Sequence, residues 1–535
     1  MKSKWILVAV LVLAAILRLY RLADFPAGLN ADEAALGYNA YSLLTTGRDE
    51  HGHPWPINLE SFGDFKPALY AYILIPFIKI FGLTELAIRL PSAIVGILAV
   101  WFIYLFVRDI YPGEKLGVLA ALTLAISPWH LHFSRGGWEV NVATTFILIG
   151  TWFFIKWLKN PKFLWLGICG LGLVLSMYAY QSARVIAPLL GLGFVILYFP
   201  KFKAQLTQTA LAAGLLVLLL IPITKTIVTT AAASRLSGVG LLADAGPLNR
   251  ANELRGQHAD WNSALSPLFH NRPVLYSIAF LKNYTDHFFG SFLFVNGDII
   301  QRNKIPETGL LYLTDFILLA IGAVYLIKHP SPYSKIIWLW LLIAPIASAL
   351  TFQTPHALRA HSMVIPLTII VSLGVFVILR HWRFIGTCVL GIVYLWQVSR
   401  YIHQYYVHYP QTYPAAWEYG FKELVPYVES VKDRYEKILV TDKYDQPYIL
   451  FLFYSKYPPQ KFQDHHQLTV RDKFNFSTVR DYDKYHFAAT PWSQVRDIHS
   501  SLIVAAPEDI PEVGVNIVKT IYFPSGQPAF KIVSN

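Results

Sequence analysis

The sequence has few charged residues and almost no cysteine. Asp, Glu, Lys and Arg make up 15% of its 535 residues, whereas soluble globular chains carry roughly 25%. The two cysteines, Cys169 and Cys388, both lie in apolar runs, which argues against a disulfide framework or a cysteine-based metal site. The sequence also lacks a glycine-rich phosphate loop of the P-loop or dinucleotide type. These absences argue against a soluble nucleotide-binding enzyme.

Apolar runs are the main feature that is present. Hydrophobic residues make up 55% of the chain and its mean hydropathy is +0.42. An apolar run of about twenty residues crosses a bilayer as a helix. We therefore expect a mainly α-helical, polytopic membrane protein with about eleven transmembrane helices. In chain order, the expected spans are 5–17, 90–107, 116–131, 141–157, 163–180, 185–199, 208–224, 309–327, 336–350, 362–379 and 384–399.

The positive charge of the chain lies mostly in short loops. A net charge of +12 would suggest a nucleic-acid partner for a soluble protein. Here the basic residues follow apolar runs, so they orient helices by marking the cytoplasmic side, and we expect no nucleic-acid partner. Lys2 and Lys4 place the N-terminus in the cytoplasm, ahead of an uncleaved first helix. The basic loops contain Lys156, Lys159, Lys162, Lys201, Lys203, Lys328, Lys335, Arg380 and Arg383.

Alternation of sides then predicts three extracytoplasmic loops, at 24–89, 132–140 and 225–308. This assignment requires that the apolar run 67–82 does not cross the bilayer. That run is short and contains Pro76, so we expect a helix that lies in the membrane interface. The predicted location is the plasma or inner membrane of a cell, with many passes.

The last quarter of the chain differs in composition. Residues 401–535 are polar and rich in aromatic side chains, and helix-like and strand-like segments mix there. We expect a transmembrane module over 1–400 and an extracytoplasmic α/β domain over 401–535. The expected elements are helices at 416–435 and 446–455, and strands at 437–441, 501–505, 515–521 and 529–533.

The first outer loop contains an adjacent acid pair, Asp32-Glu33. With Asn30 as a plausible N-cap, the pair opens an expected helix over 32–44, where acids favour the helix dipole. Stabilisation of the helix explains the presence of these two acids as well as a catalytic role does. The alternative is that one carboxylate serves as a general base, for which Asp and Glu are chemically suited. Apolar surroundings would raise its pKa toward working pH.

A lysine before a proline, Lys66-Pro67, ends the same loop. Proline disfavours helical geometry at the preceding residue and begins helices well, so we expect Lys66 just before a helix. A cation at a helix start near the headgroups suits an anion such as a phosphate. Ordinary snorkelling of lysine at the interface explains the residue equally well.

Further polar groups are predicted on the same side of the membrane. Glu139 follows Arg135 in the second loop. Two interpretations are open: Glu139 caps the next helix, or it is a second acid that binds a sugar or a divalent metal ion. Arg184, His356 and Arg359 lie at two outward turns. Snorkelling explains each alone, but with Lys66 they would suit the phosphate of a lipid.

Three stretches resemble the multi-spanning GT-C class of glycosyltransferases, in the branch of protein O-mannosyltransferases and aminoarabinose transferases. They are D-F-P-A-G-L-N-A-D-E-A, F-G-D-F-K-P-A-L-Y and F-G-L-T-E-L-A-I-R-L-P-S-A, all in the first outer loop and the helix after it. The resemblance implies that Asp32, beside Glu33, is catalytic and that Lys66 contacts the lipid phosphate. It implies a similar phosphate role for His356 and Arg359, and a second acid at Glu139, where Trp-Glu-Val-Asn departs from the expected aspartate.

Residues and resemblance together predict transfer of a sugar from a polyprenyl-phosphate donor to an acceptor hydroxyl on the outer face, with inversion. The acceptor would be a protein, a lipid or a glycan. One alternative is a lipid or solute transporter, although transporters place ionisable residues at mid-bilayer and these spans contain few. The other is a ligase or polymerase that handles pyrophosphate-linked glycans.

Overall fold

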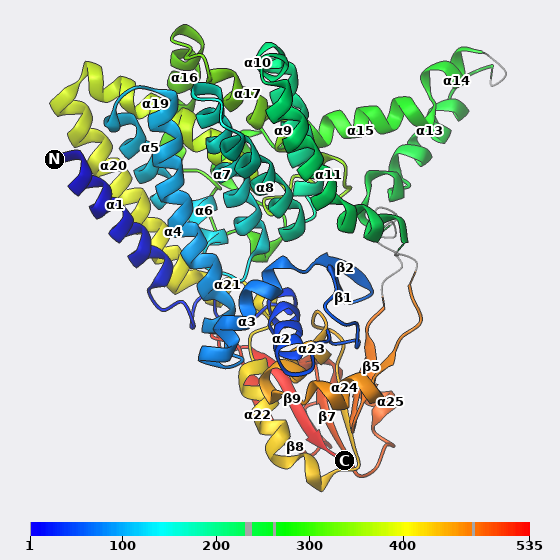
Figure 1. Cartoon of the computed structure of the whole chain (residues 1–535). Helices are drawn as coiled ribbons and strands as arrows, with labels where there is room; N and C mark the ends of the chain where they lie inside the picture. The colour runs from blue at the N-terminus through cyan, green and yellow to red at the C-terminus, as the bar shows by residue number, and fades with distance from the viewer. Residues whose placement is uncertain (1, 230–237, 261–263, 473–476) are drawn as a thin grey trace. The chain divides into compact units, whose positions relative to one another are not determined.

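The computed structural model describes residues 2–229, 238–260, 264–472 and 477–535, and most of them are helical (Figure 1). They form two compact units. Unit 1 contains Met1–Arg18, Ile94–Phe133 and Glu139–Tyr401, and unit 2 contains Leu19–Ala93, Ser134–Trp138 and Ile402–Asn535. Each unit is therefore assembled from segments that are far apart in the sequence.

Unit 1 is built from helices that coincide with the apolar runs of the sequence (Figure 1). Leucine, isoleucine, valine and phenylalanine dominate them, as a helix in lipid requires. In chain order they are α1 (Lys2–Leu19), α4 (Glu85–Ile110), α5 (Glu114–Ile126), α6 (Pro128–Phe133), α7 (Glu139–Lys159), α8 (Phe163–Ala179), α9 (Ala183–Leu197), α10 (Phe199–Ala204), α11 (Leu206–Thr229), α16 (Leu313–Lys328), α17 (Ser334–Ile343), α18 (Ile346–Ala349), α19 (Val364–His381) and α20 (Arg383–His403). Residues 85–93 of α4 belong to unit 2, as do the terminal residues 19 of α1 and 402–403 of α20.

Among the described residues, five helices are long and apolar enough to cross a membrane. They are Glu85–Ile110, Glu139–Lys159, Leu206–Thr226, His361–His381 and Arg383–Thr412. Several other apolar helices are shorter, among them Phe163–Ala179 and Ala183–Leu197. The protein is a multi-pass membrane protein, as the apolar runs predicted, whereas the total of about eleven spans stays a prediction.

Helices α16 and α19 approach each other at two glycines. A Cβ atom on Gly322 would collide with the carbonyl oxygen of Ile370, and one on Gly374 with that of Leu318. Small residues at such a crossing allow membrane helices to pack backbone to backbone. Leu318 and Val371 are buried beside the crossing. The crossing fixes these two helices against each other.

The long loop predicted at 225–308 contains further helices of unit 1. Residues 230–237 and 261–263 of that loop lie outside the described residues. The described part contains η2 (Leu241–Ala243), α13 (Gly246–Gly256), α14 (Leu265–Phe269), α15 (Arg272–Asp286), η3 (Ser291–Val295) and η4 (Gln301–Asn303). A short η5 (His361–Met363) precedes α19.

Unit 2 begins with α2 (Ala31–Thr46), a hairpin of β1 (Asn58–Ser61) and β2 (Asp64–Pro67), and α3 (Leu69–Phe81). Phe62 and Gly63, at the turn, both have positive φ, which suits the twist of a tight hairpin. The thirteen residues of α3 span about 20 Å at 1.5 Å per residue, too short to cross the hydrocarbon core. The length of α3 therefore supports an interfacial position.

The C-terminal part of unit 2 contains a seven-stranded mixed sheet with strand order β4-β5-β6-β3-β7-β9-β8. Strands β5, β7, β8 and β9 of this sheet are labelled in Figure 1. At its centre β3 runs parallel to β6 and β7, and the other pairs are antiparallel. The strands are β3 (Lys437–Val440), β4 (Gln467–Leu468), β5 (Val479–Tyr482), β6 (Tyr485–Phe487), β7 (Ser501–Ala505), β8 (Ile517–Tyr522) and β9 (Pro528–Ser534). The α/β character predicted for this region is confirmed.

Side chains alternate across that sheet and fill a core on each face. Leu439, Ile503 and Val533 pack on one face with Val495 and Ile510. Aromatic rings fill the other face, and the Phe421 and Phe530 centroids are 5.0 Å apart. The accompanying helices are η6 (Gln404–His408), α21 (Tyr409–Thr412), η7 (Ala415–Trp417), α22 (Phe421–Val431), η8 (Lys432–Arg434), α23 (Pro447–Ser455), α24 (Pro459–His465), α25 (Trp492–Val495) and η9 (Pro507–Asp509).

Candidate active site

The acid pair lies in the first turn of α2, as the sequence predicted. The side chain of Asn30 caps the helix, because its Oδ1 accepts a hydrogen bond of 3.1 Å from the backbone N–H of Glu33. Adjacent side chains on a helix point about 100° apart, so Asp32 and Glu33 face different environments. The side chain of Asp32 is 27% exposed, whereas that of Glu33 is fully buried.

Asp32 forms an ion pair with Lys66. The Lys66 ammonium donates to Asp32 Oδ1, and it also lies 4.5 Å from the centre of the Phe62 ring. Lys66 is on β2, opposite Leu59 of β1, and α3 begins two residues after Pro67. The extended geometry expected before the proline is present, but Lys66 belongs to a strand and not to a helix start. The hairpin therefore carries the cation to the helix that carries the carboxylate.

Glu33 is held in a buried network. Arg89 of α4 donates to both of its carboxylate oxygens, at 3.0 and 3.2 Å, and the N–H of Gly137 donates to Oε1 at 2.6 Å. Arg89 also donates to the carbonyl oxygens of Pro26 and Gly28. These contacts fix the chain that leads into α2, so Glu33 positions Asp32. Arg89 was not singled out from the sequence, although it lies in the A-I-R-L-P stretch that carried the resemblance.

The second outer loop is divided between the units. Arg135, in unit 2, donates to the carbonyl oxygens of Tyr20 and Phe25, and its guanidinium lies 5.0 Å from the ring centre of Tyr405. Glu139, in unit 1, is the first residue of α7 and is buried. A helix-start position agrees with capping, and the role of Glu139 as a second acid stays a prediction.

His356 and Arg359 lie in unit 1 beside an acid that the sequence analysis did not single out. Asp298 accepts a hydrogen bond of 2.6 Å from the N–H of Ala357, and its Oδ2 is 3.5 Å from His356 Nδ1. Burial raises the pKa of Asp298, and nearby Arg359 opposes that rise. Arg359 donates to Thr351 Oγ1 at 2.7 Å. The structure therefore groups two predicted phosphate ligands around one buried aspartate.

Arg184 lies in the first turn of α9, where its Nε donates to the carbonyl oxygen of Met177 at 3.2 Å. This contact ties the side chain to the end of α8. Its predicted role at a phosphate stays a prediction. In the sequence, only the position of Arg184 at an outward turn indicated a role in phosphate binding.

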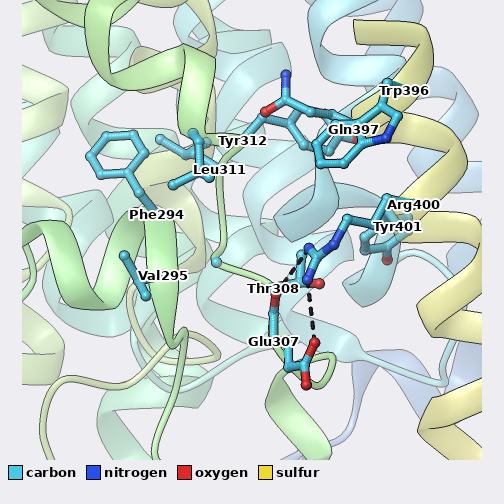
Figure 2. Close-up of a pocket in the computed structure, with 12 residues that line it drawn as sticks. Phe294, Val295, Glu307, Thr308, Leu311, Tyr312, Trp396, Gln397, Arg400 and Tyr401 are labelled. Atoms are coloured by element: carbon cyan, nitrogen blue, oxygen red, sulfur yellow. Dashed lines mark hydrogen bonds and ion pairs between the residues drawn. The ribbon is translucent and has the colours of Figure 1, made fainter. Parts of the chain in front are cut away.

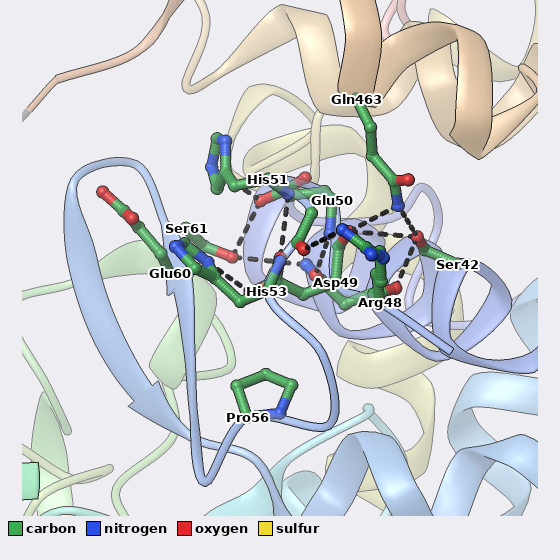
Figure 3. A network of polar contacts seen from close by, with 12 residues as sticks. Ser42, Arg48, Asp49, Glu50, His51, His53, Pro56, Glu60, Ser61 and Gln463 are labelled. Atoms are coloured by element: carbon green, nitrogen blue, oxygen red, sulfur yellow. Dashed lines mark hydrogen bonds and ion pairs between the residues drawn. The ribbon is translucent and has the colours of Figure 1, made fainter. Parts of the chain in front are cut away.

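A second polar network in unit 2 surrounds Glu50, between α2 and the hairpin (Figure 3). Ser61 Oγ donates to Glu50 Oε1 at 3.0 Å, and the N–H of Glu50 donates to Asn39 Oδ1 at 2.9 Å. Burial raises the pKa of Glu50 to about 8, with a further rise from the charge of Asp49. Burial also lowers the pKa of His51 to about 3. The pair therefore lies buried with both groups uncharged near neutral pH.

A divalent metal ion was one option for the second acid, Glu139. The described residues contain no group of three or more His, Cys, Asp or Glu side chains that could hold a metal ion. Near Glu50, His51 Nδ1 is 3.1 Å from His466 Nε2, while His51 Nε2 is 3.7 Å from Glu50 Oε1. The two neighbours face opposite ring nitrogens, so the three groups form a line and do not converge on one point.

The architecture is that of the GT-C membrane glycosyltransferases. It is similar over 99% of this chain to ArnT from Cupriavidus metallidurans, with a TM-score of 0.59 for the structure bound to undecaprenyl phosphate and 0.56 for the apo structure. Each alignment covers 98% of ArnT, at 10% sequence identity. At that identity the likeness establishes the fold. The resemblance drawn from the sequence is thus confirmed at the level of architecture.

Sequence comparisons point to the same class. Residues 65–224 match the family model described as dolichyl-phosphate-mannose-protein mannosyltransferase. YycA of Bacillus subtilis (strain 168), which carries a provisional assignment as a mannosyltransferase, is 25% identical over 145 residues. That alignment covers 27% of this chain and about a fifth of the length of YycA. The family-model match begins one residue before Lys66.

Proposed function

We propose that this protein transfers a sugar from a polyprenyl-phosphate-linked donor to an acceptor hydroxyl on the extracytoplasmic face of the cell membrane. The observation that carries the proposal is the partly exposed ion pair between Asp32 and Lys66 in unit 2. A carboxylate and an ammonium in contact provide a base and a phosphate ligand at one place. The match to a mannosyltransferase family model and the ArnT-like fold, which in one structure holds undecaprenyl phosphate, support it.

The charges balance through the proposed step. Asp32 takes the proton of the acceptor hydroxyl while the acceptor oxygen bonds to the anomeric carbon. The bond from that carbon to the phosphate oxygen breaks, and its electron pair adds a second negative charge to the phosphate. Asp32 loses its own charge at the same moment, which releases Lys66 to the departing phosphate. Because the displacement is single, the anomeric centre inverts.

The other residues predicted from the sequence would assist the reaction by binding the donor. Arg184, His356 and Arg359 would add positive charge around the lipid phosphate. Glu139 would bind sugar hydroxyls or a divalent cation. The loop at 225–308 would cover the site, and the C-terminal domain would contact the acceptor, which is a protein, a lipid or a glycan. In this proposal the N-terminus is cytoplasmic and the C-terminal domain extracytoplasmic.

The test compares donors on the purified full-length protein. Polyprenyl-monophosphate-linked sugars, starting with mannose, should be consumed, and pyrophosphate-linked glycans should not. Asp32→Asn should lower kcat by about 10²–10⁴-fold, the usual contribution of a general base. Lys66→Gln should raise KM for the lipid donor as well as lower kcat.

Two matched variants control for charge loss in the same region. Asp24→Asn removes a half-exposed carboxylate that pairs with Arg21, and Lys79→Gln removes an exposed ammonium on α3. Both should keep near-normal turnover. Consumption of pyrophosphate-linked donors alone would favour a ligase, and lipid movement without sugar transfer would favour a transporter. Near-normal turnover by Asp32→Asn would remove the proposed base.

A further inference from the structure

A groove of about 650 Å³ lies between the C-terminal ends of α16 and α19 in unit 1. It begins at the level of the glycine crossing, at Ala320 and Ile321, and extends to the ends of both helices. On α16 the lining residues form two rows spaced four residues apart, so they occupy one face of the helix. The groove is lined by Ala320, Ile321, Val324, Tyr325, Lys328, His329, Val377, Arg380 and His381.

Chemistry changes along this groove from apolar to basic. Its walls are aliphatic at Ala320, Ile321, Val324 and Val377, and its end carries Lys328, Arg380 and two histidines. His329 stacks on Tyr325 with ring centroids 4.5 Å apart, which holds one imidazole at the rim. The basic residues follow directly after the apolar segments of both helices. They therefore mark the level where hydrocarbon gives way to headgroups.

The positive charge at this rim has no acidic partner in the described part of the chain. No Asp or Glu lines the groove, and neither Lys328 nor Arg380 takes part in an ion pair there. A second cavity of unit 1, of about 310 Å³, shows the contrast (Figure 2). There Arg400 donates to the Glu307 carbonyl oxygen at 3.0 Å and lies 3.4 Å from its carboxylate. That cation is already neutralised, whereas the groove cations are not.

We propose that this groove binds an anionic glycerophospholipid of the surrounding bilayer. An acyl chain would lie against the aliphatic walls, and the headgroup phosphate would meet Lys328 and Arg380 at the rim. Basic pockets between transmembrane helices are known to take anionic headgroups, and the lipid presents its charge and its chain in the order that the groove requires. Free phosphate would satisfy the rim and leave the walls without a ligand. This site is separate from the proposed sugar transfer and does not depend on it.

The experiment measures thermal unfolding of the full-length protein in nanodiscs of phosphatidylcholine, with and without added phosphatidylglycerol. A ligand that binds the folded state alone raises Tm by mass action. Phosphatidylglycerol should therefore raise the Tm of the native protein by a few degrees. Lys328→Gln/Arg380→Gln should abolish that rise. Val324→Trp, which fills the groove without changing its charge, should abolish it too.

The matched control is Lys335→Gln/Arg383→Gln, which removes two exposed charges that do not line the groove. It should keep the full rise, and native mass spectrometry should show phosphatidylglycerol retained by the control and lost from the groove variants. Equal loss in both double variants would mean that general surface charge is responsible and would overturn the site. An equal rise with inorganic phosphate in phosphatidylcholine discs, or no rise at all, would also overturn it.

Discussion

Among the described residues, the ammonium of Lys66 forms an ion pair with one carboxylate, that of Asp32, and in the proposed reaction it later binds a phosphate. It donates to Asp32, and only 11% of the Lys66 side chain is exposed. An incoming lipid phosphate must compete with Asp32 for this cation. The competition ends when Asp32 accepts a proton, because the neutral acid no longer holds the ammonium by charge.

Asp32→Asn should therefore separate binding from turnover. Loss of the competing charge should leave the affinity for undecaprenyl phosphate unchanged or tighten it by up to about fivefold, the range of a partly exposed ion pair. Binding to the variant and to Asp24→Asn would be measured by calorimetry in nanodiscs. If Asp32→Asn weakened binding tenfold or more, the carboxylate would be part of the phosphate site and not its competitor.

Glu50 and His51 are a second residue-level feature, and their effects on stability oppose each other. Folded Glu50 keeps its proton up to about pH 8, whereas an unfolded glutamate loses it near 4.5. Unfolding in that window releases a proton, so stability falls as pH rises. His51 titrates near 3 when folded and near 6.5 when unfolded, so its contribution falls as pH drops below 6.5. Between 4.5 and 6.5 the two slopes cancel.

Above pH 6.5 the slope of Glu50 alone should remain. Between pH 6.5 and 8 the native protein should lose about 1.4 kcal/mol of stability per pH unit through this group. Glu50→Gln, which keeps an acceptor for Ser61, should remove that slope, as measured by thermal unfolding across the window. Glu60→Gln on the same hairpin is the control and should keep it. A Glu50→Gln profile parallel to the native one would mean that Glu50 is ionised in the folded protein.

At the scale of elements, local signals in the sequence were sufficient for helices but not for the hairpin. Asn30 with two acids predicted the start of α2, and the first turn is built as expected. Strands β1 and β2 were not predicted, because each is only four residues long and Phe62-Gly63 is not a familiar hairpin dipeptide. The proximity of Asp32 to Lys66 was predicted through the family resemblance. Strand β2, which brings Lys66 to Asp32, was not predicted.

Hydrogen-bond partners that are distant in the sequence could not be predicted from local sequence patterns. Glu33 meets Arg89 and the N–H of Gly137, which are 56 and 104 residues away. Asp298 meets Ala357 across 59 residues. Neither spacing follows a helical or strand period, so only the tertiary fold brings these groups together. The same reason explains why Glu50, which follows Asp49 in a polar loop, was not singled out.

The packing of α16 on α19 gives a test at the element scale. Gly322→Ala should destabilise the protein by roughly 1–3 kcal/mol, because the new methyl group collides with the backbone of α19. Gly391→Ala is the matched control on α20, where a Cβ meets no atom within 4 Å. It should be neutral or slightly stabilising, since alanine favours helix more than glycine does. Equal effects in thermal unfolding would mean that α16 and α19 do not pack at Gly322.

For the whole molecule, sidedness is the property that the proposed reaction requires. The donor site and the sheet of unit 2 must face away from the cytoplasm, and the basic loops must face it. The structure groups residues 19–93 with residues 402–535 in one unit. That grouping is expected if both belong to the extracytoplasmic part of the protein.

Cysteine labelling tests this sidedness in intact cells. In a Cys169→Ala/Cys388→Ala background, Ser525→Cys in the turn before β9 should react with a membrane-impermeant maleimide from outside. Lys203→Cys, in a predicted cytoplasmic loop, should react only after the membrane is opened. Both positions are exposed, so accessibility within the protein does not differ between them. Labelling of Lys203→Cys alone in intact cells would invert the proposed topology.

Helix α2 holds the hairpin at two points, Asp32 to Lys66 and Asn39 to Ser61. Asn39 follows Asp32 by seven positions, about two helical turns, so both side chains lie along one line of the helix. One added residue between them would rotate the second anchor by about 100° and turn it off that line. The part of α2 between Asp32 and Asn39 should therefore tolerate substitutions far better than insertions or deletions. Its length determines whether the Asp32 carboxylate can reach the Lys66 ammonium while Asn39 still contacts Ser61.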